Sequence, residues 1–197
     1  PTLRELRLNA QTGGHTVYGV DGAVSAWVMD ADADGNIERP DDKVWAFFGL
    51  RRGGRAYFAL DISDPDAPKK MWSVSHTDPG MSELGQSWSE PVVTRVPGIE
   101  APVIIIAGGY DSNKDNAGIG TPDSMGRAVF ILDAESGDIV HRFTATESTT
   151  IGITRFPATD SLATKVSIMD TDGDSVTDRF YAVDTGGNVW RFDLPDD

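Results

Sequence analysis

The sequence contains no cysteine among its 197 residues. Disulfides, thiolate chemistry and cysteine-ligated zinc are therefore excluded within the chain. Basic residues are also few, because 17 Lys and Arg stand against 31 Asp and Glu, which gives a formal net charge of −14. Nucleic acids and anionic membranes both require a basic face, so we expect no nucleic-acid partner and no direct membrane insertion.

Long apolar runs are missing as well. The apolar run "PVIIIAGG" at 102–109 is far too short to span a bilayer. The chain opens on "PTLRELRLNA", which has no signal-peptide pattern. We therefore expect a segment whose targeting signal, if the protein has one, lies outside these residues.

Sequence signatures of catalysis are lacking too. The three histidines are widely separated, and we find neither a nucleophile–base pairing nor a glycine-rich phosphate loop. We therefore predict that the chain is not an enzyme.

What the sequence does contain is a repeat of short β-rich runs separated by Gly, Asp and Pro. Each unit has a first strand, a second strand that ends in paired glycines, and a third strand that ends in aspartate. In the first two units a turn and a fourth strand follow. Asp61, Asp133 and Asp193 mark the ends of the third strands. The units recur every roughly 60–70 residues, and four-stranded antiparallel units in series indicate a β-propeller.

We therefore predict an all-β fold, an incomplete β-propeller of about three four-stranded antiparallel blades with the last one truncated. Blade one covers about 23–74, blade two about 88–144, and blade three about 164–197 without its last strand. A β-sandwich with accidental periodicity is the alternative. The five tryptophans lie on or beside these strands, and we expect them to pack the blades.

The stretch "MDTDGDSVTD" (169–178) holds four aspartates within nine positions. Carboxylates this close repel each other unless they surround a cation or point apart into water. Ca²⁺ takes about six to eight oxygen ligands, and a tight loop supplies them from alternate residues. Gly173 permits the bend, and a solvated hairpin is the alternative. The predicted ligands are the side chains of Asp170, Asp172, Asp174 and Asp178 and the carbonyl oxygen of Val176.

A second copy of this loop precedes it by 140 residues, because "WVMDADADGN" (27–36) aligns with "SIMDTDGDSV" (167–176). Both loops connect the first and second strands of their blades, and the middle blade lacks one. The spacing resembles an EF-hand loop, but strands rather than helices flank it. Matching "DDKVWAFF" to "TDRFYAVD" favours Asp42 as the closing ligand, with Asp41 as the alternative. The predicted ligands are Asp30, Asp32, Asp34, Asn36 through its carbonyl, Glu38 directly or through water, and Asp42.

Five stretches run in one order across nearly the whole chain: "VYGVDGAVSAWVMDADADG", "RRGGRAYFALDISDP", "ELGQSWSEPVV", "GGYD" and "GGNVWRFDL". Together they resemble the C-terminal domain of PilY-type proteins of bacterial type IV pili. The resemblance implies an exported protein at the pilus tip, cell surface or outer membrane of a Gram-negative bacterium. It implies roles in pilus assembly, twitching and attachment, with the minor pilins or tip complex and host or abiotic surfaces as partners. A calcium loop in that family opposes pilus retraction when filled, and the second loop here matches it at Asp170, Asp172, Asp174 and Asp178.

The predicted function is therefore a calcium-binding propeller module of a pilus-tip adhesin and assembly factor, with Ca²⁺ as its cofactor. The alternative is a blade segment of a quinone-cofactor dehydrogenase, because "GGNVWRFDL" and "ALDISDPDAPKKMW" are similar to blades of those enzymes. Their calcium lies in the central funnel with ligands from distant blades, whereas every ligand predicted here is local to one hairpin.

Two further segments are candidates for contact with a partner. "RRGGR" (51–55) is either a solvated turn or a contact for an anion or a glycan. The loop 110–126 is a long insertion in blade two, and long insertions are often functional. It is our first candidate for a partner-contact surface.

Overall fold

The computed structural model describes residue 6 and residues 17–115, 121–145 and 152–194. Within these ranges the chain forms twelve β-strands and one short 3-10 helix, η1 (Ser112–Asp115). In this part of the chain no helix has the length and apolar character needed to cross a membrane. Residues 116–120 of the predicted contact loop and residues 195–197 of the predicted third blade lie outside the described ranges.

The two outer sheets are antiparallel meanders in which each strand pairs with the next along the chain. The first sheet consists of β1 (Val24–Met29), β2 (Lys43–Gly49), β3 (Ala56–Asp61) and β4 (Lys69–Ser75). The third sheet consists of β10 (Ser167–Met169), β11 (Arg179–Val183) and β12 (Val189–Asp193). These open sheets confirm the predicted all-β, propeller-type fold, including a last blade with fewer strands.

The middle sheet differs from the prediction because it has five strands instead of four. They are β5 (Val92–Val96), β6 (Ile99–Ala107), β7 (Ala128–Asp133), β8 (Ile139–Thr144) and β9 (Ile153–Arg155). The added strand β9 runs parallel to β8 along its outer edge. An uncovered edge leaves a row of backbone groups unpaired, and this short strand supplies partners for them. Three residues are too few to show a periodicity in the sequence.

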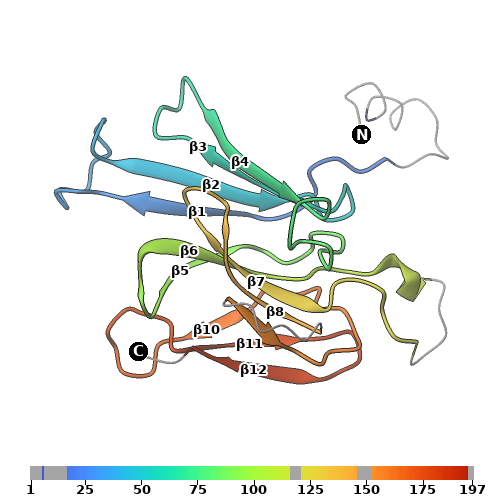
Figure 1. Cartoon of the computed structure of the whole chain (residues 1–197). Helices are drawn as coiled ribbons and strands as arrows, with labels where there is room; N and C mark the ends of the chain where they lie inside the picture. The colour runs from blue at the N-terminus through green and yellow to red at the C-terminus, as the bar shows by residue number, and fades with distance from the viewer. Residues whose placement is uncertain (1–5, 7–16, 116–120, 146–151, 195–197) are drawn as a thin grey trace.

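The three sheets stack in layers, with the middle sheet between the other two (Figure 1). Side chains alternate across a strand, so the continuous apolar runs of β6 and β7 place apolar side chains on both faces of the middle sheet. Ile104, Ile106 and Phe130 pack toward the first sheet, with Trp45 and Phe47. Their neighbours on the opposite face pack toward the third sheet: Val103, Ile105, Val129 and Ile131, against Phe180 and Phe192.

The first two sheets repeat each other in detail. Each has a register shift one residue before the aspartate that ends its third strand, between Ala59 and Leu60 and between Ile131 and Leu132. The sheets are joined where the Trp72 indole N–H donates to the carbonyl oxygen of Ala134 at 3.0 Å. This repetition of an irregularity shows that one structural unit recurs.

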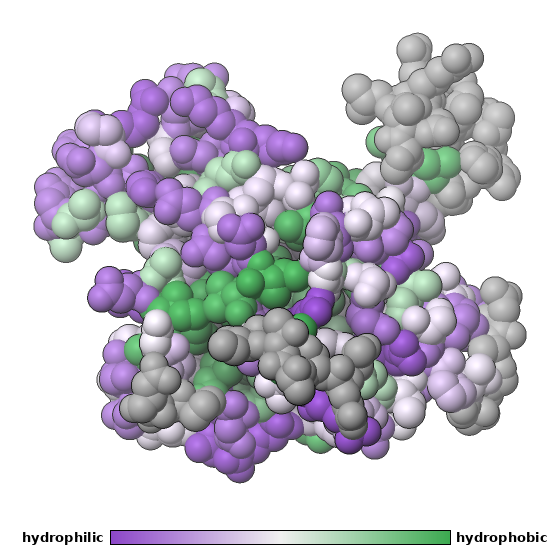
Figure 2. Space-filling model, in the orientation of Figure 1, coloured by the Kyte–Doolittle hydropathy of each residue, from purple (hydrophilic) through white to green (hydrophobic). Residues whose placement is uncertain are grey.

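The tryptophans mostly pack the blades, as predicted. Trp45 and Trp72 are buried, and Trp27 and Trp190 pack against the two cores. Trp88 differs, because its ring lies beside the guanidinium groups of the β2–β3 turn. The surface in Figure 2 is largely hydrophilic, with a band of hydrophobic residues at the level of the middle sheet.

Candidate metal centre

Two aspartate-rich loops join the first and second strands of the outer sheets. The first loop (residues 30–42) connects β1 to β2, and the second loop (residues 170–178) connects β10 to β11. Both lie at the same end of the stacked sheets, on the left of Figure 1. Strand pairing fixes their ends, because Met29 pairs with Lys43 and Met169 with Arg179 immediately beside the loops.

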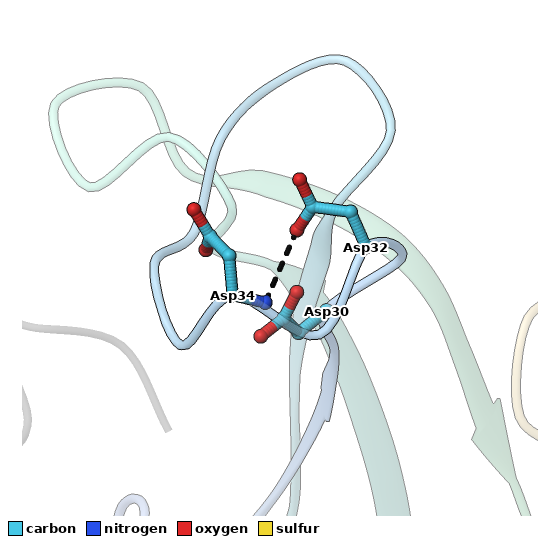
Figure 3. A group of neighbouring side chains, drawn as sticks. All are labelled: Asp30, Asp32 and Asp34. Carbon is cyan, nitrogen blue, oxygen red and sulfur yellow. Dashed lines mark hydrogen bonds between the residues drawn. The ribbon is translucent and has the colours of Figure 1, made fainter.

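The first loop gathers three carboxylates (Figure 3). Asp30, Asp32 and Asp34 each offer an oxygen, and these oxygens lie within 4.8 Å of one another. The N–H of Asp34 donates to Oδ1 of Asp32 at 3.3 Å, and the N–H of Gly35 donates to Oδ2 of Asp30 at 2.8 Å. Oδ1 of Asp30 is buried and has no hydrogen-bond partner among the described residues. A buried oxygen of this kind beside two other carboxylates is suited to a bound cation.

The second loop repeats this arrangement. One oxygen from each of Asp170, Asp172 and Asp174 lies within 4.8 Å of the other two. The N–H of Ser175 donates to Oδ2 of Asp170 at 2.9 Å, as Gly35 does to Asp30 in the first loop. Two more hydrogen bonds recur. The N–H of Asp174 donates to Asp172 at 3.2 Å, as that of Asp34 does to Asp32. The N–H of Val176 donates to Asp174 at 2.7 Å, as that of Asn36 does to Asp34 at 2.7 Å.

The backbone bends at equivalent positions in the two loops. Ala33 has φ +59° and Gly173 has φ +87°, and these residues are 140 positions apart. Gly35 has φ +86° and Ser175 has φ +71°, again 140 positions apart. Each loop therefore has one glycine and one residue with a side chain at its two left-handed positions. The same path through a strained region, followed by two different sequences, indicates that the loop geometry itself is required.

The predicted fourth carboxylate of each loop holds the loop closed. Asp42 is 5% exposed, and its two oxygens accept the N–H groups of Ala31 (2.8 Å) and Glu38 (2.6 Å). Asp178 accepts both the N–H (2.5 Å) and the hydroxyl of Thr171, the residue equivalent to Ala31. Neither carboxylate belongs to the group of three in its loop. Each one instead ties the end of its loop to the residue after the first aspartate.

Comparison with known proteins assigns the chain to a family. Residues 1–197 match the family described as the PilY1 beta-propeller domain. The chain belongs to the PilY1 β-propeller family. It is 34% identical over 196 residues to the type IV pilus biogenesis factor PilY1 of Pseudomonas aeruginosa strain PAK, covering 98% of this chain and 14% of the relative. A PilY1 homolog of Xylella fastidiosa is 27% identical over 156 residues, covering 74% of this chain and 9% of that protein.

A solved structure shows the same fold. The crystal structure of the Pseudomonas aeruginosa PilY1 C-terminal domain matches with a TM-score of 0.62 and 28% identity, covering 89% of this chain and 30% of that one. The chain therefore spans only a part of the PilY1 proteins that it matches.

The charges of this PilY1-family second loop are not evenly stabilised. The N–H groups of Gly173 and Ser175 lower the pKa of Asp170. The pKa of Asp172 is raised overall. The hydrogen bond from the N–H of Asp174 acts to lower it, but repulsion from the neighbouring aspartates outweighs that bond. In the first loop, hydrogen bonds from the Asn36 side chain and backbone lower the pKa of Asp34. The loops thus favour charged carboxylates and leave repulsion at the centre of the second one, which a cation would relieve.

The remaining predicted ligands lie around these groups without joining them. The side-chain amide of Asn36 donates to Oδ2 of Asp34 at 3.0 Å, so its N–H faces the aspartates. The Glu38 carbonyl accepts from Asp42 N–H at 3.1 Å, and Asp41 is exposed where Asp42 is buried. Val176 and Asp174 line an open pocket together with the turn between β5 and β6. The donor set is oxygen alone, which suits Ca²⁺ and not a soft metal.

The sequence did not reveal how the second loop is attached to the middle sheet. The N–H of Thr177 donates to the carbonyl oxygen of Arg95 at 2.9 Å, and the hydroxyls of Thr177 and Thr94 lie 2.7 Å apart. These residues are about 80 positions apart and share no motif, so only the stacking of the sheets brings them together. These two contacts attach the second loop directly to β5 of the middle sheet.

Proposed function

We propose that this chain is a calcium-binding β-propeller segment of a type IV pilus biogenesis factor. In this proposal, calcium in the two aspartate loops regulates pilus extension and retraction and surface attachment. The observation that carries it is the pair of loops, each holding three carboxylate oxygens within 4.8 Å of one another on the same backbone path. The relatives, which are named type IV pilus biogenesis factors, support the pilus assignment.

The proposed location is the pilus tip or cell surface of a Gram-negative bacterium, after export. The proposed partners are the pilus, through its minor pilins or tip complex, and host or abiotic surfaces. The net charge of −14 supports the exclusion of nucleic acids as partners. This charge also suits a module whose ligand is a cation.

A non-enzymatic role is favoured over a quinone-cofactor dehydrogenase. Each group of three carboxylates comes from one hairpin, whereas those enzymes collect calcium ligands from distant blades. Incubation of the chain with a quinone cofactor and calcium separates the two functions. We expect no bound chromophore after gel filtration, and a stoichiometric chromophore would favour the enzyme.

Isothermal titration calorimetry tests calcium binding directly. We expect two equivalents of Ca²⁺ for the unaltered chain, one for Asp32→Ala, one for Asp172→Ala, and none for the double variant. Asp21→Ala is the matched control, because it removes an exposed carboxylate outside both loops and should keep two equivalents. An unaltered chain that takes up no calcium at millimolar concentration would contradict the proposal.

The regulatory part of the proposal requires the longer protein. We expect Asp172→Ala to disturb pilus extension and retraction more than Asp32→Ala, because the second loop has the compact spacing and is attached to the middle sheet through Thr177. Twitching motility and pilus retraction, followed in cells that produce each variant, measure this difference. Equal effects of the two variants would remove the special role of the second loop.

A further inference from the structure

The turn between β2 and β3, residues 50–54, is fastened to the segment that leads into the middle sheet. The N–H of Arg51 donates to the Ser87 carbonyl at 3.2 Å, and the N–H of Ser87 donates to the Gly54 carbonyl at 3.1 Å. The hydroxyl of Ser87, which is 1% exposed, accepts the N–H of Leu50 at 2.8 Å and donates to Gly54 at 3.1 Å. The turn is therefore held rigidly in one position relative to Trp88.

Arg51 adopts a strained backbone conformation in this turn. Its φ is +52°, in the left-handed region that glycine occupies freely, yet Gly53 and Gly54 follow it only later in the turn. This conformation places its guanidinium 4.2 Å from the centre of the Trp88 ring. Strain of this kind is concentrated at functional sites, where the surrounding structure holds the residue in place.

A second guanidinium joins the same group of rings. Arg52 lies 5.4 Å from the Trp88 ring and 5.2 Å from the Tyr18 ring, and it donates to the Tyr18 hydroxyl at 3.3 Å. Tyr110 extends the group, with its ring centre 5.4 Å from that of Trp88. Tyr110 also begins the long 110–126 insertion, so the group of rings adjoins the start of this loop.

Among the described residues, no acidic side chain pairs with either guanidinium group. Within the described ranges, neither Arg51 nor Arg52 is within ion-pair distance of a carboxylate, although the chain carries 31 acidic residues. Stacking on an aromatic ring occupies the face of a guanidinium and leaves its N–H edge available for hydrogen bonds in the plane. That edge matches the two oxygens of a carboxylate.

We propose that Arg51, Arg52 and Trp88 form a docking site for a carboxylate side chain from an acidic segment of a partner protein. The overall charge of −14 repels an extended polyanion, but a single carboxylate needs to approach only this local positive group. Arg, Trp and Tyr are the residues most enriched at the centres of protein interfaces. The site lies at the end of the first sheet opposite its aspartate loop, so it stands independently of calcium binding (Figure 1).

Nuclear magnetic resonance with the ¹⁵N-labelled chain tests the proposal. The probe is the peptide Ac-GEEG-NH2, with Ac-GQQG-NH2 as its uncharged counterpart and a hyaluronan oligosaccharide as a source of uronate. We expect the acidic peptide alone to shift the Arg51 and Arg52 Nε–H signals and the Trp88 indole signal in a saturable way. A response to the oligosaccharide in its place, or no saturable response to any probe, would overturn the proposal.

Two variants separate geometry from charge and from folding. R51K/R52K keeps both positive charges but loses the planar fork, and we expect at least tenfold weaker peptide binding. Arg51→Gly removes the strained side chain, so the fold should keep its stability while binding weakens. Arg191→Lys, on the third sheet, is the control and should leave binding unchanged. Unchanged binding in R51K/R52K would show that charge alone attracts the peptide and would contradict the proposed site.

Discussion

Calcium should stabilise the folded chain, and Asp172→Ala should remove about half of that stabilisation. Strand pairing beside each loop brings the carboxylates together only in the folded state, so the unfolded chain offers no equivalent site. A ligand that binds only the folded state adds RT ln(1 + [L]/Kd), which is about 2.7 kcal/mol at 100 times Kd. Two independent loops would add about 5.4 kcal/mol to the free energy of unfolding, and a variant with one loop inactivated would keep about 2.7 kcal/mol of it.

Thermal unfolding followed by circular dichroism measures this difference. For a chain of this size, 1 kcal/mol corresponds to a shift in Tm of about 2–4 °C, so each filled loop should raise Tm by about 5–11 °C. The comparison is between saturating calcium and a chelator, for the unaltered chain, Asp172→Ala and the Asp21→Ala control. Equal calcium-induced shifts in the unaltered chain and in Asp172→Ala would show that Asp172 does not contribute to calcium binding.

Asp172→Asn separates the two roles of this side chain, as a charged calcium ligand and as a hydrogen-bond acceptor within the loop. The Asp172 carboxylate accepts the N–H of Asp174 at 3.2 Å, and an asparagine oxygen would preserve that bond. In chelator, Asp172→Asn should therefore be at least as stable as Asp172→Ala, while its calcium-induced shift should be smaller than that of the unaltered chain. An undiminished shift would show that the charge of this carboxylate is unimportant for binding.

Three further predictions follow from the described contacts, each measured by urea unfolding in chelator. Ser175→Gly should raise stability by up to about 1 kcal/mol and Gly173→Ala should lower it by about 1 kcal/mol, because both positions have left-handed backbone conformations. A Cβ at Gly173 would touch nothing, so only the backbone strain is measured there. The opposite signs would contradict the strain argument. Tyr57→Phe should cost about 1–3 kcal/mol, because it leaves the Ser89 carbonyl without the buried hydroxyl that donates to it at 2.8 Å; a neutral effect would contradict this. Burial raises the pKa of Asp111, but hydrogen bonds from Asn113, Ser124 and Met125 lower it below its usual value. Its folded pKa is thus below its unfolded value, so its contribution is present above about pH 4 and lost as the pH falls through the folded pKa. Asp111→Asn should therefore flatten the acid side of the stability profile, and an unchanged slope would argue against this role.

The repeat was predictable because its signals are local. The aspartates Asp61 and Asp133 follow alternating apolar strands, and the structure places the same register shift just before each of them. The two aspartate loops were also predictable, because aspartates at alternate positions of a short loop are close neighbours, and in the structure three of them in each loop offer oxygens within 4.8 Å of one another. In these cases a few neighbouring residues decide the structure.

The features that were missed depend on contacts between distant residues. Strand β9 has three residues, and it exists because the edge of β8 lies within reach. The stacking of Arg51 on Trp88 accompanies an isolated bridge between Arg51, in the β2–β3 turn, and Ser87, in the segment before β5, and no spacing rule predicts this pairing. The alignment of the two loops already favoured Asp42 over Asp41, but the burial of Asp42 and its bonds to the N–H groups of Ala31 and Glu38 depend on the folded loop.

Calcium anomalous diffraction from crystals grown with calcium chloride tests directly whether the two loops hold the ion. We expect one anomalous peak in each loop, the first among the carboxylates of Asp30, Asp32 and Asp34 and the second among those of Asp170, Asp172 and Asp174. Well-ordered loops without anomalous peaks, at calcium concentrations in the millimolar range, would contradict it.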